Sequence, residues 1–241
     1  MGFNDSLLRA KNAAIPVAYY IYKNNLADSI TKTIYNQSDK KNIAKWLSMS
    51  LLKGIFGGQS DSVLKTIRTV ISNSSTGLFP IKEIFDVFKS NPDKNYSFDN
   101  AVIESFLEEE HGSPVAGLVL NLLYPDIVLA YGKAIAEDHM HPKTQFEDNK
   151  KLNSLGLSAT DEEFYKEKKN YNSVLNLQLL EESKNKSKGD DALNDWAKAN
   201  GKNNVDLYIN ASTSLDILDF KDFVADRKSV LLDKMKTILS V

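Results

Sequence analysis

The stretch Asp138–Phe146 reads DHMHPKTQF and holds two of the three histidines in the 241-residue chain. Pro142 follows the second histidine and restricts the backbone at that point. Aspartate and histidine beside each other can hold a metal ion and accept a proton. Taken alone, however, the stretch is more typical of a polar loop than of an active site, so its interpretation depends on the rest of the chain.

A second polar stretch, NSVLNLQLLEESKNKSK over residues 172–188, supplies the missing context. Asn176 precedes a short apolar run, Asn185 follows nine residues later, and Lys188 comes three residues after that. An Asn-x-x-Lys at the start of a helix carries little information by itself, because asparagine is a common helix cap. The ordered combination of the two stretches is much more specific than either one.

This combination resembles the HNH, or ββα-metal, nuclease motif of homing endonucleases, many restriction enzymes and one nuclease module of RNA-guided CRISPR enzymes. In that family a strand ends in Asp-His, a loop leads to a second strand, and a helix carries the last Asn or His. The resemblance implies hydrolysis of DNA phosphodiester bonds with Mg²⁺ or Mn²⁺ as cofactor, since oxygen donors suit these ions.

The same resemblance implies a role for each motif residue. Asp138 and Asn185 would hold the metal ion. His139, with an ordinary pKa of about 6.5, would accept a proton from water. Asn176 would fix the loop that orients this histidine. The residues expected to line the site or contact phosphate oxygens are His141, Lys143, Lys184, Lys186 and Lys188.

Some polar residues near the motif keep more than one interpretation. His141 could be a third ligand, a phosphate contact or a structural donor. His111 follows three glutamates and is expected to be a solvated loop histidine. The basic run over residues 166–169 is interpreted as a solvated helix face, so Lys143 inside the motif is the better phosphate contact.

The resemblance extends to the C-terminal nuclease region of GmrSD-type DNA-defence endonucleases, which join a ParB-like nucleotidase domain to an HNH domain. It rests on residues 172–188 with Trp196 shortly after, on GIFGGQSDSVLKTIR (54–68) and on the closing DFKDFVADRKSVLLDKMKTIL. The Asp-Gly-Gln-Gln-Arg motif of the ParB-like domain does not occur here, so nucleotide hydrolysis is not carried over. We expect the chain to be the C-terminal portion of a longer protein that acts against phage or other foreign DNA. A ParB-like domain or subunit is a candidate partner.

Apolar residues recur at helical spacing along most of the chain, which predicts a mostly α-helical protein. Strand signals are short and lie near Gln145–Phe146 and over residues 174–180. Helices are expected near residues 13–22, 43–51, 64–71, 80–88, 100–110, 115–124, 127–136 and 220–238, with a short one beginning near residue 160. We expect a helical scaffold over residues 1–130. Residues 131–241 would hold a small ββα-metal core and a C-terminal helix that packs back on the body.

Composition limits the alternatives. Hydrophobic residues make up 42% of the chain, enough for a sizeable core, and the net charge of −2 means that DNA contact needs a local basic patch. The chain lacks cysteine, which excludes disulfides and thiolate metal sites and fits a reducing cytoplasm. The longest apolar run, residues 115–132, is interrupted by Asn121, Pro125 and Asp126, so no membrane span is expected.

Three other functions fit the same residues. The first is a helical interaction or DNA-binding fragment whose nuclease site is inactive without the missing N-terminal region. The second is an RNA-cleaving or non-specific nuclease. The third, a metalloprotein that cleaves nothing, is disfavoured by the pair of asparagines. A single HNH site cuts one strand, so a monomer is expected to nick DNA.

Overall fold

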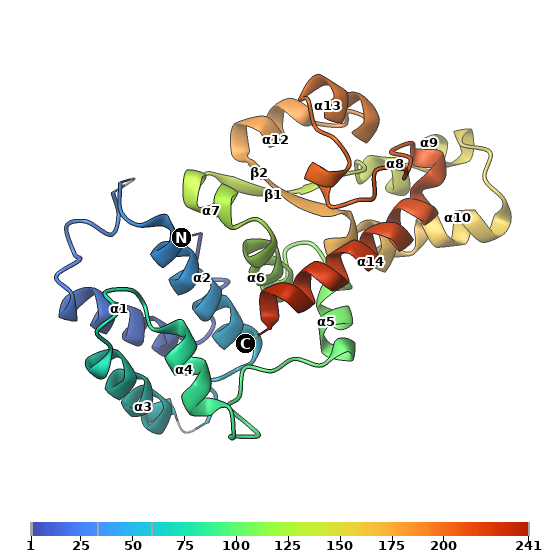
Figure 1. Ribbon diagram of the computed structural model, residues 1–241. Coiled ribbons are helices and arrows are strands. Elements are labelled where there is room, and N and C mark those ends of the chain that lie inside the picture. Colours follow the sequence, from blue (N-terminus) through green and yellow to red (C-terminus); the bar gives the residue numbers. More distant parts are fainter. Residues whose placement is uncertain (1, 33, 59, 241) are drawn as a thin grey trace. The chain divides into compact units, whose positions relative to one another are not determined.

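The computed structural model describes residues 2–32, 34–58 and 60–240 (Figure 1). Helices dominate this part of the chain, and its named strands form one two-stranded sheet, so the mostly α-helical prediction is confirmed. The chain forms two compact units. The first is drawn from residues 1–98 and 128–133 and from the C-terminal end after residue 238, and the second from residues 99–127 and 134–238.

The first unit is built from α1 (Ala14–Lys23), α2 (Gln37–Leu52), α3 (Ser60–Asn73) and α4 (Ile81–Phe88). Its core surrounds Trp46, which is fully buried and donates from Nε1 to the hydroxyl of Tyr96 at 3.0 Å. The buried carboxylate of Asp39 accepts from the Tyr20 hydroxyl at 2.9 Å and from the Phe79 N–H at 2.6 Å. Buried polar groups are stable only when hydrogen-bonded in this way, so these bonds help to fix the helices around one core.

The second unit holds the two strands of the sheet, β1 (Ile135–His139) and β2 (Leu177–Glu181). Its α-helices are α5 (Asn100–Leu107), α6 (Pro114–Leu123), α8 (Thr144–Glu147), α9 (Asn149–Ser154), α10 (Ala159–Lys166), α11 (Lys168–Tyr171), α12 (Glu182–Lys188), α13 (Leu193–Ala199) and α14 (Phe220–Leu239). The helix α7 (Pro125–Tyr131) is shared between the units.

α6 lies within residues 99–127, which belong to the sheet-containing unit. Ser113 caps this helix by accepting from the Ala116 N–H at 3.0 Å, and Pro114 occupies its first turn. Every residue from Ala116 to Leu123 is buried, and the helix contacts β2. A helix that is apolar all round must be covered on all sides, so residues 99–127 belong with the sheet.

Within the described ranges, no single helix is long and apolar enough to cross a membrane, and α6 with α7 meets that criterion only as a bent pair.

The sheet pairs β1 and β2 in antiparallel register, with Asp138 opposite Gln178 and His139 opposite Leu177. α12 follows β2 directly and contacts both strands, and Figure 1 shows it beside them. Residues 177–180 of β2 are all buried. The strand is therefore an uninterrupted part of the core, and its position fixes the end of β1.

Two local predictions are wrong. The segment Gln145–Phe146 is helical, within α8, because Phe146 is buried against the rings of Tyr171 (centroids 5.0 Å apart) and Phe220 (4.5 Å). The helix expected to run into Ala136 ends at Tyr131, since Gly132 takes the left-handed backbone conformation, with φ of 58°. The residues after this turn pair with β2 and form β1.

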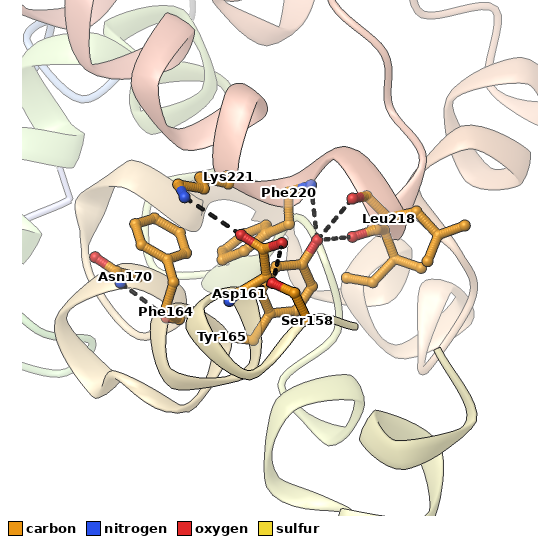
Figure 2. A network of polar contacts seen from close by, with 9 residues as sticks. Ser158, Asp161, Phe164, Tyr165, Asn170, Leu218, Phe220 and Lys221 are labelled. Atoms are coloured by element: carbon orange, nitrogen blue, oxygen red, sulfur yellow. Dashed lines mark hydrogen bonds and ion pairs between the residues drawn. The ribbon is translucent and has the colours of Figure 1, made fainter. Parts of the chain in front are cut away.

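The start of α14 is fixed by α10. The Tyr165 hydroxyl lies 2.6 Å from the carbonyl oxygen of Ile217 and 2.9 Å from that of Leu218, and it accepts from the Phe220 N–H at 3.2 Å (Figure 2). Lys221 and Asp161 form an ion pair beside this cluster at 3.2 Å. These contacts hold the first turn of α14, whose rings cover the loop after β1.

Candidate active site

Asp138 lies near the end of β1, and both of its carboxylate oxygens are engaged. Oδ2 accepts from Nε2 of Gln178 at 2.8 Å, as expected for directly opposed residues of an antiparallel pair. Oδ1 lies 3.1 Å from Nζ of Lys188 on α12. Burial raises the pKa of the Asp138 carboxyl, and the Lys188 ammonium and the Gln178 amide act in the opposite direction.

Lys188 is turned into the protein. Its side chain is fully buried, and Nζ donates to the carbonyl oxygen of His139 at 2.6 Å and lies 6.0 Å from the ring centre of Trp196. The ammonium therefore ties α12 to the last two residues of β1. The predicted contact between Lys188 and a phosphate would require this group to leave Asp138.

His139 is partly buried beside two polar residues that are distant in sequence. Its Nε2 lies 2.9 Å from Oδ1 of Asn172, and its ring centre lies 4.9 Å from that of His111. Burial lowers the pKa of His139 to about 4, while the hydrogen bond to Asn172 raises it. The imidazole is therefore neutral at pH 7, which is the form that can accept a proton.

His111 contributes to this site although its sequence context indicates a solvated loop. Its side chain is partly exposed, but Nε2 lies 3.9 Å from Oε2 of Glu137, and the same oxygen accepts from the Gly112 N–H at 2.9 Å. The pairing of β1 with β2 and the loop before α6 bring these residues together. No local pattern in the sequence indicates the contact between His111 and His139.

Asn176 is fully buried directly behind the end of β1. Its Oδ1 accepts from the His141 N–H at 2.9 Å, and its Nδ2 donates to the carbonyl oxygens of His141 at 3.0 Å and Tyr171 at 2.8 Å. The Met140 N–H donates to the Asn176 carbonyl oxygen at 2.8 Å. These bonds hold the backbone that follows His139, and their effect on catalysis stays a prediction.

His141 faces the aromatic core. It is 1% exposed, and its ring stands edge-on to Phe220 (centroids 5.3 Å apart) and Phe223 (4.6 Å). It also borders a cavity of about 250 Å³ together with Pro142 and Leu193. Within the described part of the chain its Nε2 has no hydrogen-bond partner, and burial lowers the pKa of His141 to about 3.

The burial of His141 predicts that the free energy of unfolding depends on pH. Its folded pKa lies below the unfolded value of about 6.5, so the unfolded chain binds the proton first as the pH falls. This contribution to stability is fully present above about pH 6.5 and is lost toward pH 3. Between pH 7 and pH 4 the loss is on the order of 3 kcal/mol.

We expect His141→Phe to stay folded at pH 7, because the new ring fits among Phe220 and Phe223 and no hydrogen bond of Nε2 is lost. Urea unfolding at several pH values should show a shallower fall in stability below pH 6.5 than in the wild type. Met140→Leu, a buried neighbour without a titrating group, is the control and should keep the wild-type slope. If stability falls equally steeply with pH in His141→Phe and in wild type, the pH dependence does not come from His141.

The other predicted phosphate contacts lie at the surface. Lys186 pairs with Glu182 at 2.6 Å, Lys143 pairs with Glu147 at 3.1 Å, and Lys184 is exposed. Exposed ion pairs of this kind contribute little to stability, so these lysines can exchange a carboxylate for a phosphate at low cost.

Asn185, the second predicted metal ligand, is partly exposed and precedes Lys188 by three residues, which places it on the same side of α12.

The residue types fit a divalent cation held by few protein ligands. Asp138 offers a carboxylate and Asn185 an amide oxygen, and Mg²⁺ commonly takes one or two such groups together with water and phosphate oxygens. The Lys188 ammonium already lies on Oδ1 of Asp138, so a metal ion at this oxygen would have to displace it. Residues 2–32, 34–58 and 60–240 contain no group of three or more His, Cys, Asp or Glu side chains arranged to hold a metal.

Comparison with known proteins adds no assignment: no protein-family model and no curated protein matches this sequence.

Proposed function

We propose that this chain is a metal-dependent endonuclease of the HNH type that nicks DNA. The observation that carries the proposal is the order of β1, β2 and α12, an antiparallel pair followed directly by a helix that contacts both strands. Asp138 and His139 end the first strand, and Lys188 of the helix touches Asp138 one turn after Asn185. The resemblance to the HNH family implies two strands and a following helix in this order, with Asp-His at the end of the first strand.

The proposed reaction is hydrolysis of a phosphodiester bond. His139 would remove a proton from a water molecule, whose oxygen attacks phosphorus while the bond to the 3′ oxygen breaks. Asn176 would keep the backbone after His139 in place through its bonds to His141. Asp138 and Asn185 would hold Mg²⁺ or Mn²⁺, which would supply charge stabilisation at the phosphate.

The biological setting is proposed from the sequence resemblance. We propose action against phage or other foreign DNA in the cytoplasm, with a ParB-like nucleotidase domain or subunit as the partner. Because the net charge is only −2, phosphate contacts would come from local lysines such as Lys143, Lys184 and Lys186. Weak binding to non-specific DNA is the expected consequence.

Nicking of supercoiled plasmid with Mg²⁺ or Mn²⁺ tests the proposal. We expect His139→Ala to lower the cleavage rate at least about 100-fold, because the proton acceptor is removed. Asn185→Ala should raise the metal concentration needed for half-maximal cleavage. Asn153→Ala, which changes an exposed asparagine on α9, is the matched control and should cut like wild type.

Different outcomes remove different parts of the proposal. An intact plasmid with wild-type protein at all metal concentrations would contradict the nuclease function. Equal cutting by wild type and His139→Ala would leave cleavage standing and remove the mechanism. A labelled RNA of the same sequence, incubated in parallel, distinguishes a DNase from a non-specific nuclease.

One observation favours the alternative of an interaction or DNA-binding fragment that is inactive by itself. Lys188 occupies Oδ1 of Asp138, so the carboxylate is already neutralised within the protein. If the wild type binds a DNA duplex without cutting it, this alternative gains support. Restored cutting after addition of the N-terminal partner would then identify the chain as the nuclease half of a larger enzyme.

A further inference from the structure

Asn172 joins His139 to an ion pair that the motif does not include. Its Oδ1 lies 2.9 Å from Nε2 of His139, and its Nδ2 donates to Oε2 of Glu110 at 3.2 Å. The same oxygen of Glu110 lies 2.7 Å from Nζ of Lys168. Four side chains therefore form a continuous series that ends on the imidazole of His139.

The chemistry of this series sets the direction of each hydrogen bond. The hydrogen bond and charge of Lys168 lower the pKa of Glu110, so its carboxylate is ionised at pH 7 and can only accept. The amide NH₂ of Asn172 must then face Glu110, which turns Oδ1 toward His139. An amide oxygen cannot donate, so Nε2 of His139 must carry the hydrogen.

The backbone makes this arrangement rigid. Glu110 and Ser173 form an antiparallel bridge, the His111 N–H donates to the Asn172 carbonyl oxygen at 2.7 Å, and the Val174 N–H donates to that of Glu109 at 3.0 Å. Asn172 is 5% exposed, so water does not compete freely for its amide. The segment before α6 and the segment before β2 are thus held together at this point.

We propose that Asn172 is a positioning residue that fixes His139 as the Nε2–H tautomer and leaves Nδ1 as the nitrogen that accepts a proton. Glu110 acts through Asn172 by fixing the direction of the amide. Within the described residues the side-chain hydrogen bond of this imidazole is made by Nε2, which leaves Nδ1 without a side-chain partner. The catalytic meaning rests on the proposed nuclease function, whereas the tautomer does not.

The tautomer can be measured without any cleavage. In ¹⁵N-labelled protein at pH 8, a long-range ¹H–¹⁵N spectrum reports which nitrogen of each of the three imidazoles carries hydrogen. His111→Gln and His141→Phe assign the signals. We expect wild-type His139 to show a protonated Nε2 whose hydrogen exchanges slowly with water, and an unprotonated Nδ1.

Asn172→Ala should remove the slowly exchanging Nε2 hydrogen and give His139 signals averaged between the two tautomers. The double variant Asn172→Asp with Glu110→Gln provides a rescue, because the new carboxylate accepts from Nε2–H and the new amide donates to that carboxylate. A purely structural role of Asn172 would not predict this pattern.

Cleavage rates supply the second readout. We expect Asn172→Ala to lower kcat by roughly 10–100-fold with KM little changed, and the double variant to recover most of it. Thermal melting of each variant identifies any that fail to fold. If Asn172→Ala does not fold, the double variant is compared with wild type in its place.

Two results would overturn the inference: a wild-type His139 that carries its hydrogen on Nδ1, or an Asn172→Ala spectrum and kcat that match wild type. If wild type gives the expected spectrum but no nicking, only the proposed function fails.

Discussion

Lys188→Met is expected to lower the free energy of unfolding of the sheet-containing unit by about 3–5 kcal/mol at pH 7. The substitution removes the ammonium that lies 3.1 Å from Oδ1 of Asp138, while the carboxylate stays buried and keeps the hydrogen bond from Gln178. It also leaves the carbonyl oxygen of His139 without the hydrogen bond from Nζ. A buried charge that has lost its partner lowers stability far more than an exposed one, because water cannot solvate it.

Urea unfolding followed by circular dichroism and tryptophan fluorescence measures this change. Lys186→Met is a matched control on the same helix, because its ion pair with Glu182 is largely exposed, and the expected change is under about 1 kcal/mol. The loss in Lys188→Met should shrink as the pH falls, because burial raises the pKa of Asp138 and the carboxyl becomes neutral. Adding Asp138→Asn should restore most of the stability at pH 7. Equal effects of the two lysine variants would contradict the buried ion pair.

Arg227→Ala is expected to destabilise the same unit by a similar amount, about 3–5 kcal/mol. Arg227 is fully buried on α14 and donates to the carbonyl oxygens of Leu177 (2.6 Å) and Leu207 and to the hydroxyl of Tyr124 (3.2 Å). Truncation leaves these acceptors buried without a donor and opens a cavity. Since Leu177 is the register partner of His139, the end of β1 should also lose its fixed position.

Hydrogen exchange of the β2 amides, measured together with urea unfolding, reports both effects. Lys236→Ala is the control on the same helix, because its side chain is partly exposed and its ion pair with Asp233 lies at the surface. Arg227→Lys should recover only part of the loss, since one ammonium cannot reach the same set of acceptors in the geometry of a guanidinium. Full stability of Arg227→Ala would mean that these hydrogen bonds contribute nothing net.

Much of the fold follows from local patterns. Apolar spacing predicts helices near residues 43–51, 115–124 and 220–238, and α2, α6 and α14 form there. The local predictions that are wrong concern segments whose secondary structure depends on contacts with residues distant in the sequence. Phe146 joins a helix because aromatic rings from other elements surround it, and β1 forms because β2 is present to pair with it.

The candidate site divides in the same way. The motif indicates Asp138, His139 and Asn176 as a group, and in the folded protein they lie at one end of the sheet. The sequence does not reveal Asn172, Glu110 or His111 as neighbours of His139. Their contacts depend on a backbone bridge between segments about 60 residues apart, and no spacing rule describes such a bridge.

The run KNKSK, residues 184–188, separates what the sequence determines from what the tertiary structure decides. The HNH resemblance implies a helix here, and the sequence by itself shows that the segment carries three lysines. Lys184 and Lys186 stay in solvent, whereas Lys188 is buried against Asp138. That difference arises from the packing of α12 on β1, because only long-range packing determines which charge loses its water and must find a partner within the protein.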